Sequence, residues 1–524
     1  MGNVFIEQKT RDSFLNLILD TLHKQKQALV FVNTKKSAEK QAEDIAKYLK
    51  RGSTTHEELA KKILSVLAAP TQQCARLAGC IKAGIAFHHS GLHTKQREII
   101  EEAFKRKDIT IICATPTLAA GVDLPAFRAI IKDIKRFGRH GMDYIPILEY
   151  HQMIGRAGRP SFDTAGEGIT IAKSEPEKEE IYRRYHLGAP EEITSKLACE
   201  PALRIYLLSL IAGRFTTTHN QIMTFFSQTF WAHQYHDMTE LHNIIQEQLH
   251  KLQDWNLITT THPNTSPSGF TSADKITTQE YHPTQLGSRV CELYLDPQTA
   301  HNFVEALNTS TRISTNTFSF THLICTALEI QPLLHVRTKE FDIINQKTIE
   351  YMPHLLVLEP SLYDPDYERF LDTIKTALML TAWMDEQTEQ HILETYDTRP
   401  GETRTKLDNA TWLLYCLLEI GRVIGTNKKT IHEINKTRIR LKYGIKEEII
   451  PLVKFKGIGR IRARKLYTNN IRSISDIKRT DLTTLSQLVG TTMARLLKEQ
   501  VGEPTPTPPS PLKRKGQLGL GRYQ

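Results

Sequence analysis

The stretch Ala28–Lys50, ALVFVNTKKSAEKQAEDIAKYLK, decides the fold of the first part of the chain. Its apolar, partly β-branched beginning, Ala28–Thr34, predicts a strand, and the charged segment that follows predicts a helix. The same order returns in GIAFHHS, TKQREIIEEAFKRK and finally ITIICAT at Ile109–Thr115. Strands that alternate with helices predict a doubly wound, mostly parallel sheet over residues 1–190. Ligands of such sheets bind beyond the carboxyl ends of the strands, where the polar segments fall here.

The composition places the chain among globular proteins of several domains. It has 524 residues, of which 40% are hydrophobic and 24% charged, so collagen-like and wholly disordered proteins are excluded. No apolar run approaches the roughly eighteen residues that a membrane span needs. The first residues lack a signal-peptide pattern, which predicts a cytoplasmic protein. The seven scattered cysteines are typical of a reducing compartment and are interpreted as core residues.

Helical patterns dominate after residue 190. Residues 191–290 combine helices with a polar turn at Thr260–Lys275, and this predicts a winged helix, a fold that serves either in DNA binding or as a spacer. Residues 291–445 carry apolar side chains at helical spacing and predict a helix bundle. Residues 501–524 are rich in Pro and Thr and then basic, so we expect a disordered basic tail.

Positive charge is concentrated near the end of the chain. The whole protein has a formal charge of +10, and residues 446–500 hold twelve basic but only five acidic residues. Such a concentration favours a polyanionic partner, although a solvated basic face remains the alternative.

The segment EYHQMIGRAGRP, Glu149–Pro160, carries the strongest functional signal. Gln152, Arg156 and Arg159 form the pattern Q-x-x-G-R-x-G-R, in which two guanidinium groups lie on one side of a helical turn. Arginine keeps its charge and its planar fork suits a transferring phosphoryl group. Without its neighbours, an Arg-Gly-rich turn is more often an ordinary loop.

A second segment, ATPTLAAGVDLPA at Ala114–Ala126, follows a predicted strand. Thr115 and Thr117 place hydroxyl groups at the strand's end, Gly121 allows a close backbone approach, and Asp123 supplies a carboxylate. With AFHHSGL and LVFVNTKKSAE upstream, these segments resemble motifs IV, IVa, V and VI of superfamily 2 helicases of the Ski-like branch. From about residue 25 to 500, the chain resembles the archaeal HelQ-like DNA helicases (the "308" class).

The resemblance implies roles for individual residues. Arg156 and Arg159 would act as arginine fingers on ATP, Gln152 would sense the nucleotide, and Gly121 and Asp123 would contribute to the ATP cleft. His89, Ser90 and Thr115 would lie near the DNA backbone. The three histidines His88, His89 and His93 lack a fourth ligand, so we expect no metal site.

The segment FGRHGM between motifs V and VI predicts a β-hairpin with glycines at its turn. Its tip holds Arg136, Phe137, Arg139 and His140. In the family the corresponding hairpin separates the strands, and an aromatic ring there replaces the lost stacking partner of the last base pair. A plain surface hairpin is the alternative.

The segment RPGETRTKLDNATWLLY predicts a continuous helix on which Arg404 and Trp412, eight positions apart, share one face. The family uses an Arg and a Trp from one helix as a ratchet that grips successive bases. In the alternative interpretation, Trp412 belongs only to the core.

The segment LVKFKGIGRIRARKL predicts a helix-hairpin-helix motif. Gly457 and Gly459 would let backbone N–H groups cap a phosphate, with Arg460, Arg462 and Arg464 adding charge. At the extreme end, Gln517, Leu520 and Tyr523 are similar to a sliding-clamp-binding peptide, with a merely basic tail as the alternative.

The resemblance therefore implies a multidomain α/β plus α fold: a RecA-like lobe, a winged helix, a helical ratchet bundle and a helix-hairpin-helix. A complete motor also needs a first RecA-like lobe whose G-x-x-x-x-G-K-[ST] and Asp-Glu-x-His boxes hold ATP and Mg²⁺, and neither box occurs in this sequence. We expect the C-terminal half of a split 3′-to-5′ DNA helicase, completed by a separate polypeptide that carries the first lobe. A truncated chain is the plain equivalent, and a non-catalytic DNA-binding protein is the alternative function. Forked and single-stranded DNA, ATP and Mg²⁺ are the expected ligands, and a nucleoid-associated location follows from them.

Overall fold

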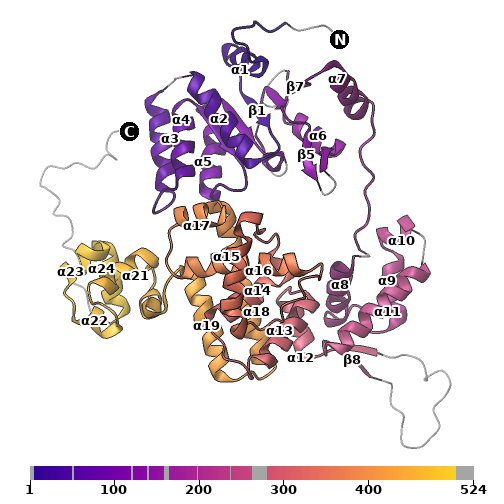
Figure 1. The fold of residues 1–524 in the computed structure, drawn as a ribbon, viewed down its shortest axis with the longest axis vertical. Helices are drawn as coiled ribbons and strands as arrows, with labels where there is room; N and C mark the ends of the chain where they lie inside the picture. The colour runs from indigo at the N-terminus through magenta and orange to yellow at the C-terminus, as the bar shows by residue number, and fades with distance from the viewer. Residues whose placement is uncertain are drawn as a thin grey trace, which may run out of the picture.

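A computed structural model describes residues 5–49, 52–119, 122–124, 126–138, 141–158, 165–197, 199–235, 238–261 and 280–502. The N-terminal part, the helical part and the C-terminal unit are distinct in Figure 1. Several predicted features lie outside the described residues: Gly121, Arg139, His140, Arg159, most of the turn 260–275, nearly all of the tail 501–524, and Gln517, Leu520 and Tyr523 within it. The backbone of Phe137 is described, but its side chain is not.

A five-stranded parallel sheet forms the centre of the N-terminal part, as the sequence predicts. Its strands are β1 (Ala28–Phe31), β2 (Ile85–His88), β3 (Ile111–Ala114), β4 (Arg128–Ile131) and β7 (Glu167–Thr170), in the order β2-β3-β1-β4-β7. The first four strands are buried along their whole length, because side chains on both faces of each strand lie in the core. The parallel register brings the carboxyl ends of β1, β2 and β3 to one edge of the sheet.

Helices surround this sheet and complete its core. They are α1 (Ser13–His23), α2 (Lys35–Leu49), α3 (Thr54–Ser65), α4 (Gln72–Lys82), α5 (Thr94–Lys105), α6 (Ile147–Ile154) and α7 (Glu175–Ile181). The sequence predicts α2 and α5. It gives no separate expectation for α3 and α4, which begin at the side-chain caps Ser53 and Thr71.

The predicted hairpin is confirmed between β4 and α6. Strands β5 (Lys135–Gly138) and β6 (Gly141–Tyr144) pair antiparallel, with Gly138 opposite Gly141. Gly141 has a φ of +119°, a conformation that a residue with a Cβ rarely adopts.

The helical part shares one continuous hydrophobic core that extends from Leu203 to Leu441. Its first elements are α8 (Glu200–Ala212), α9 (His219–Ser227), α10 (Phe230–Tyr235), α11 (Met238–Asp254), β8 (Ile258–Thr261), β9 (Glu280–Pro283) and α12 (Gln285–Glu292). The bundle follows with α13 (Pro297–Thr309), α14 (Thr317–Cys325), α15 (Phe341–Tyr351), α16 (Tyr367–Met384), α17 (Glu389–Tyr396), α18 (Pro400–Val423) and α19 (Lys428–Tyr443). Helices α8–α11 with the β8–β9 hairpin have the elements expected of a winged helix, which stays a prediction.

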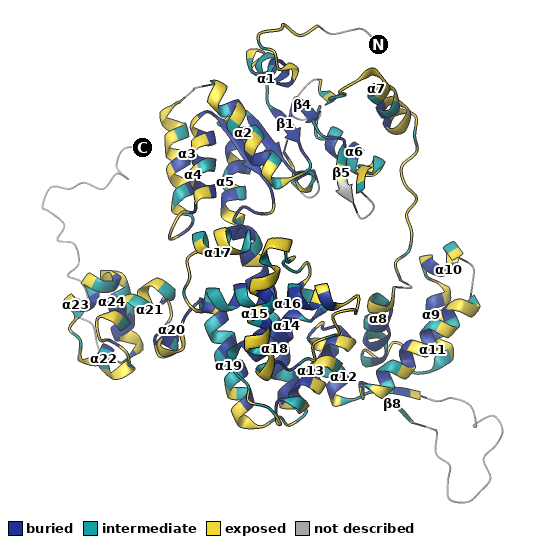
Figure 2. Ribbon diagram, in the orientation of Figure 1, coloured by how far each residue is buried: buried dark blue, intermediate teal, exposed yellow. Residues whose placement is uncertain are grey.

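Helix α18 runs through the middle of the bundle in Figure 2, where much of it is dark blue because it is buried. Leu413, Leu414 and Leu417 are fully buried there, so one face of α18 belongs to the core. The last unit has its own core and consists of α20 (Ile450–Val453), α21 (Arg460–Thr468), α22 (Ile474–Arg479), α23 (Leu482–Val489) and α24 (Thr491–Gln500). Among the described residues, no helix is both long and apolar enough to cross a membrane.

Candidate nucleic-acid and nucleotide site

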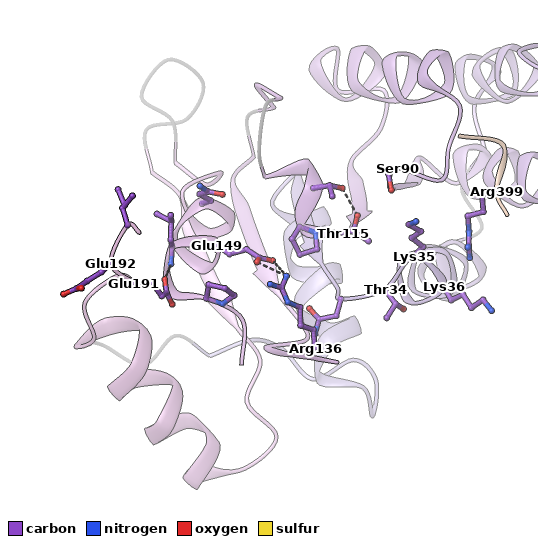
Figure 3. Close-up of a pocket in the computed structure, with 17 residues that line it drawn as sticks. Thr34, Lys35, Lys36, Ser90, Thr115, Arg136, Glu149, Glu191, Glu192 and Arg399 are labelled. Atoms are coloured by element: carbon purple, nitrogen blue, oxygen red, sulfur yellow. Dashed lines mark hydrogen bonds and ion pairs between the residues drawn. The ribbon is translucent and has the colours of Figure 1, made fainter. Parts of the chain in front are cut away.

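A cavity of about 1120 Å³ opens at the carboxyl ends of the strands, where the sequence places the ligand site. Figure 3 shows side chains from several motifs around it. Thr34 follows β1, Ser90 follows β2 and Thr115 follows β3, because parallel strands end at the same edge of the sheet. The other lining residues come from the segments after β1 and β3, the hairpin, α6 and the residue before it, the segment after α7 and the bundle: Asn33, Lys35, Lys36, Pro116, Thr117, Arg136, Pro146, Leu148, Glu149, Gln152, Glu191, Glu192, Ile193 and Arg399.

Hydroxyl groups mark two of these strand ends. Ser90 is exposed, whereas Thr115 is nearly buried and its Oγ1 lies 2.9 Å from Oγ1 of Thr117. The Asn33 side chain donates a hydrogen bond to the carbonyl of Lys135 and so fixes the end of β1 to the base of the hairpin. Hydroxyl and lysine groups on such an edge are suited to phosphate oxygens.

His89 does not lie on this surface, which corrects the expectation that it contacts the DNA backbone. It is fully buried, and its Nδ1 accepts the backbone N–H of Gly91 at 3.1 Å. Its Nε2 lies 3.2 Å from Oε1 of Glu39. Burial lowers the pKa of His89, although the Glu39 carboxylate opposes this shift. His89 therefore shapes the turn from inside, while Ser90 beside it reaches the cavity.

Gln152 lies on α6 and is exposed at the cavity, as a residue that touches a nucleotide must be. The first turn of this helix is held by Glu191, whose carboxylate accepts the backbone N–H groups of Ile147 at 2.5 Å and Leu148 at 3.1 Å. This acidic cap satisfies donors that a helix N-terminus leaves unpaired. The segment after α7 thus fixes α6, a link that the sequence did not indicate.

Arg156 is committed to the backbone rather than pointing freely into a cleft. Its Nη1 donates to the carbonyl of Val122 at 2.6 Å, and its Nη2 donates to the carbonyl of Ala119. Burial lowers the pKa of its guanidinium. Arg156 therefore braces the segment from Ala119 to Val122 in this structure, and its finger role stays a prediction. The finger role of Arg159 stays a prediction.

An ion pair joins the hairpin to α6. Nη1 of Arg136 lies 2.8 Å from Oε2 of Glu149, one turn before Gln152 on the same helix (Figure 3). At the hairpin base, Nζ of Lys135 lies 4.4 Å from the centre of the Tyr144 ring. The side chain of Arg136 thus faces a carboxylate of its own chain, a partner that the sequence analysis did not foresee.

Arg404 and Trp412 both lie on α18, which is continuous as predicted. Arg404 is exposed and pairs with Asp408 at 3.1 Å, one turn further along the helix. Trp412 is half-buried and packs against the bundle core, so the core interpretation describes part of its environment. The residue still has surface that a base can contact.

The C-terminal unit has the predicted glycine geometry. Gly457 has a φ of +86°, and a Cβ there would lie 2.6 Å from Cε of Met493. Gly459 precedes α21 and provides no side-chain cap, so the helix start has no side-chain acceptor from this position.

The arginines of this unit are used differently from the prediction. Arg464 pairs with Glu386 and Glu448 at 2.6 and 2.9 Å, and these hydrogen bonds raise its pKa. Arg460 donates to the carbonyl of Gln387 at 2.7 Å and lies over the Trp383 ring. Both side chains therefore contact the bundle in this structure, and their assignment to phosphate stays a prediction.

Arg462 donates to the carbonyl of Gly457 at 2.9 Å and remains exposed. The lysines Lys454, Lys456 and Lys465 of the same unit are also exposed. Sequence reasoning did not single them out, although the same basic run contains them.

The described residues supply only part of a nucleotide and metal site. They contain no group of three or more His, Cys, Asp or Glu side chains able to hold a metal ion. Gln152 lines the cavity, whereas Asp123 and Arg156 are not among its lining residues. Arg399 and Lys35, which also line the cavity, were missed, although Arg399 is the first residue of the quoted segment RPGETRTKLDNATWLLY.

Comparisons with known proteins agree with these features. Residues 54–161 match the family model "Helicase conserved C-terminal domain", and residues 318–444 match "Archaeal helicase, domain 4". Proteins named ATP-dependent DNA helicase Hel308 are similar over most of this chain. Those of Methanococcus vannielii, Methanocella arvoryzae and Pyrococcus horikoshii are 34%, 36% and 35% identical over 90%, 95% and 91% of it.

The chain spans 65%, 66% and 64% of the length of these three relatives. The chain is thus similar to proteins named ATP-dependent DNA helicase Hel308 over at least 90% of its own length and over somewhat less than two thirds of theirs.

Proposed function

We propose that this chain forms the second lobe and the DNA-handling part of an ATP-dependent 3′-to-5′ DNA helicase. One observation carries the proposal: the ends of three parallel strands, the base of the hairpin, the Gln152 helix and the start of α18 all meet at one cavity. A single strand that crosses this edge would contact Thr34, Ser90 and Thr115. Gln152, on the neighbouring helix, would then report the state of the nucleotide to the same edge.

ATP and Mg²⁺ would be held mainly by a first RecA-like lobe. The phosphate-cradling box G-x-x-x-x-G-K-[ST] does not occur in these 524 residues, and the relatives are longer than this chain. The first lobe would belong to a separate polypeptide, as in a split enzyme, or to a longer form of the same chain. In either case this chain would contribute Gln152, Gly121, Asp123 and Arg159, and Arg156 would take part only after leaving the carbonyls of Ala119 and Val122.

Strand separation would take place at the β5–β6 hairpin. Phe137, Arg139 and His140 near its tip would meet the last base pair, and Arg136 at its base connects the hairpin to α6 through Glu149. Arg404 and Trp412 of α18 would hold the released strand, with stacking on the order of 1–3 kcal/mol per base. The C-terminal unit would contact the emerging backbone through Gly457, Gly459 and its exposed cations.

This function would act on forked and single-stranded DNA in replication-coupled repair, at the nucleoid. The C-terminal peptide with Gln517, Leu520 and Tyr523 would bind a sliding clamp. A clamp pull-down with and without residues 503–524 tests that part separately.

Site-directed cross-linking tests the DNA path. A photoreactive amino acid placed at Ser90 should cross-link to a single-stranded oligonucleotide. The same group at Lys105, at the far end of α5, should not. Equal cross-linking at both positions, or none at Ser90, would remove the strand-end cavity from the DNA path.

A second candidate is a non-catalytic DNA-binding protein that keeps these surfaces without a motor. The Arg156 contacts favour it, because a guanidinium held by two carbonyls is not free for a phosphate. ATP turnover in the presence of a first lobe would exclude this candidate.

A further inference from the structure

A buried carboxylate joins the sheet domain to α18. Glu39, on α2, is 3% exposed and accepts hydrogen bonds from Gln73 at 2.8 Å, from Arg76 at 2.7 Å and from Arg399 at 3.0 Å. Nε2 of His89 lies 3.2 Å from the same carboxylate. Three of these four partners belong to the sheet domain. The fourth partner, Arg399, is the residue directly before the first turn of α18, and its side chain is nearly buried.

The backbone at this point is packed as closely as glycines allow. The N–H of Gly401 donates to the carbonyl of Gly91 at 3.0 Å. A Cβ on Gly401 would lie 2.3 Å from the carbonyl oxygen of Leu92, and a Cβ on Gly91 would lie 2.4 Å from Cδ of Arg399. The first turn of α18 therefore lies directly against the turn that carries Ser90.

Further polar contacts surround this junction. Lys35 forms an ion pair with Glu402, which itself accepts the backbone N–H of Arg399 at 3.0 Å. Gln390 of α17 accepts the backbone N–H of Gln72 at 2.8 Å. The junction thus has a buried charged centre, consisting of Glu39 and Arg399, and an exposed hydrogen-bonded rim.

The charges of Glu39 and Arg399 favour one arrangement of the sheet domain and α18. Burial alone would raise the pKa of Glu39. The hydrogen bonds from His89 and Gln73 and the charge of Arg399 outweigh it, so the pKa lies far below its ordinary value. The carboxylate is therefore ionised, and a rotation of α18 that removed Arg399 would leave buried charge incompletely paired. Loss of one partner of a buried pair is strongly unfavourable, whereas the formed pair adds little net stability, so this pair fixes orientation more than it adds stability.

We propose that Glu39 and Arg399 are positioning residues that hold the first turn of α18 against the turn that carries Ser90. As a result, Arg404 and Trp412 on α18 stay at a fixed distance from Ser90 and Thr115 along one nucleic-acid strand. Arg404 follows Arg399 by about one turn of helix, so little flexible chain lies between the junction and the grip. The inference rests on the proposed function only in its second half, the use of both surfaces by one strand.

The substitution Glu39→Gln tests the fixed position of α18 separately from the use of both surfaces by one DNA strand. Glu39 is buried and does not line the cavity, so its replacement by an isosteric amide removes the charge without removing a DNA contact. The matched control is Gln390→Ala, which deletes a rim hydrogen bond of the same junction and also lies away from the cavity. Arg399→Gln serves as the second variant if Glu39→Gln does not fold, and it is used for the distance measurement only, because Arg399 lines the cavity.

The first readout is the geometry itself. Spin labels on cysteines placed at Lys40 of α2 and Arg422 near the end of α18 report the distance between the two parts by pulsed electron paramagnetic resonance. Cys199 and Cys291, which are not fully buried, are replaced by serine. We expect a narrow distance distribution in the parent and in Gln390→Ala, and a broadened one in Glu39→Gln. An unchanged distribution in Glu39→Gln would overturn the proposal, whether or not the protein binds DNA.

The second readout is affinity for a single-stranded oligonucleotide that spans both surfaces. Two rigidly linked contacts act as one bivalent site, so Glu39→Gln should weaken binding about tenfold. It should have little further effect in an Arg404→Ala background, where the α18 contact is already gone. A full tenfold loss in that background would overturn the positioning role. Failure of the parent to bind any oligonucleotide would instead overturn the proposed function and leave the distance result standing.

Discussion

Arg156 is the residue whose position changes the account most. The family pattern implies that it meets a phosphate, yet its guanidinium holds the carbonyls of Ala119 and Val122. A hydrogen bond from a charged donor contributes about 1.5–3 kcal/mol, so this brace is strong enough to fix a short loop. The residue thereby controls where Asp123 lies.

Arg156→Ala should therefore loosen the segment around Val122 and Asp123 before it affects the rest of the sheet. Amide hydrogen exchange at these residues should accelerate at least tenfold, while exchange in β1 stays unchanged. Arg156→Lys should give an intermediate effect, because a lysine cannot reach both carbonyls with a planar fork. Unchanged exchange in Arg156→Ala would show that the brace has no structural role and would restore the free-finger interpretation.

The residue-scale corrections share one physical cause. The local sequence predicts which strand or helix each residue lies on or follows. Gln152, Ser90 and Thr115 therefore lie at the predicted edge of the sheet. The partners of charged side chains do not follow, because they come from distant segments. Arg464 pairs with Glu386, which lies 78 positions earlier, and no local pattern reports that contact.

At the scale of elements, the hairpin and α6 behave as one connected piece. The Arg136–Glu149 pair is partly exposed, so it contributes at most about 1 kcal/mol to stability. Its importance lies in aligning the hairpin base with the Gln152 helix.

Glu149→Gln should leave the melting temperature within a degree or two of the parent. In the completed helicase it should slow unwinding several-fold, while DNA-stimulated ATP hydrolysis stays within about twofold of the parent. Glu175→Gln, which breaks an exposed pair with Lys178 on α7, is the control and should change neither rate. Equal unwinding by Glu149→Gln and the parent would argue against a mechanical link between the hairpin and α6.

The C-terminal unit separates its docking cations from its solvent-facing cations. Each phosphate contact on single-stranded DNA contributes about 0.7 to the slope of log affinity against log salt. Replacing Lys454 and Lys456 together by alanine should therefore lower that slope by about 1.4, about 0.7 for each lysine. Arg464→Ala should leave it unchanged, because Arg464 is already paired with Glu386 and Glu448. A loss of slope in Arg464→Ala as large as in the lysine pair would favour the original phosphate assignment.

The elements themselves were predicted more fully than their connections. Alternating apolar and helical segments predicted the parallel sheet, because periodicity depends on neighbours in sequence. The cap of α6 by Glu191 was not predictable in this way, since the two lie more than forty positions apart.

At the scale of the whole molecule, the parts are more closely joined than a domain list suggests. Residues 191–290 and 291–445 were expected as separate domains, but one hydrophobic core extends across the boundary from Leu203 to Leu441. The sheet domain meets this helical part through Glu39 and Arg399, and the C-terminal unit meets it through Arg464. Composition changes mark where patterns switch, but they do not report how two surfaces pack.

This connectivity supports a motor in which movement of the sheet domain is passed directly to α18. Helix α18 begins at the sheet domain and ends in the bundle, and it carries both proposed DNA contacts of the bundle, Arg404 and Trp412. The proposal therefore needs only one moving junction, between this chain and the first lobe.

ATP turnover tests the central claim most directly. This chain is combined with a first RecA-like lobe from a Hel308-type helicase, and ATP hydrolysis is measured in the presence of single-stranded DNA. The parent is compared with Gln152→Ala and with the control His151→Ala. His151 is an exposed neighbour on α6 that does not line the cavity. The account predicts DNA-stimulated turnover in the parent and in His151→Ala, and a fall of about tenfold or more in Gln152→Ala. Equal turnover by Gln152→Ala and the parent, or no turnover by the parent although it binds both DNA and the first lobe, would contradict it.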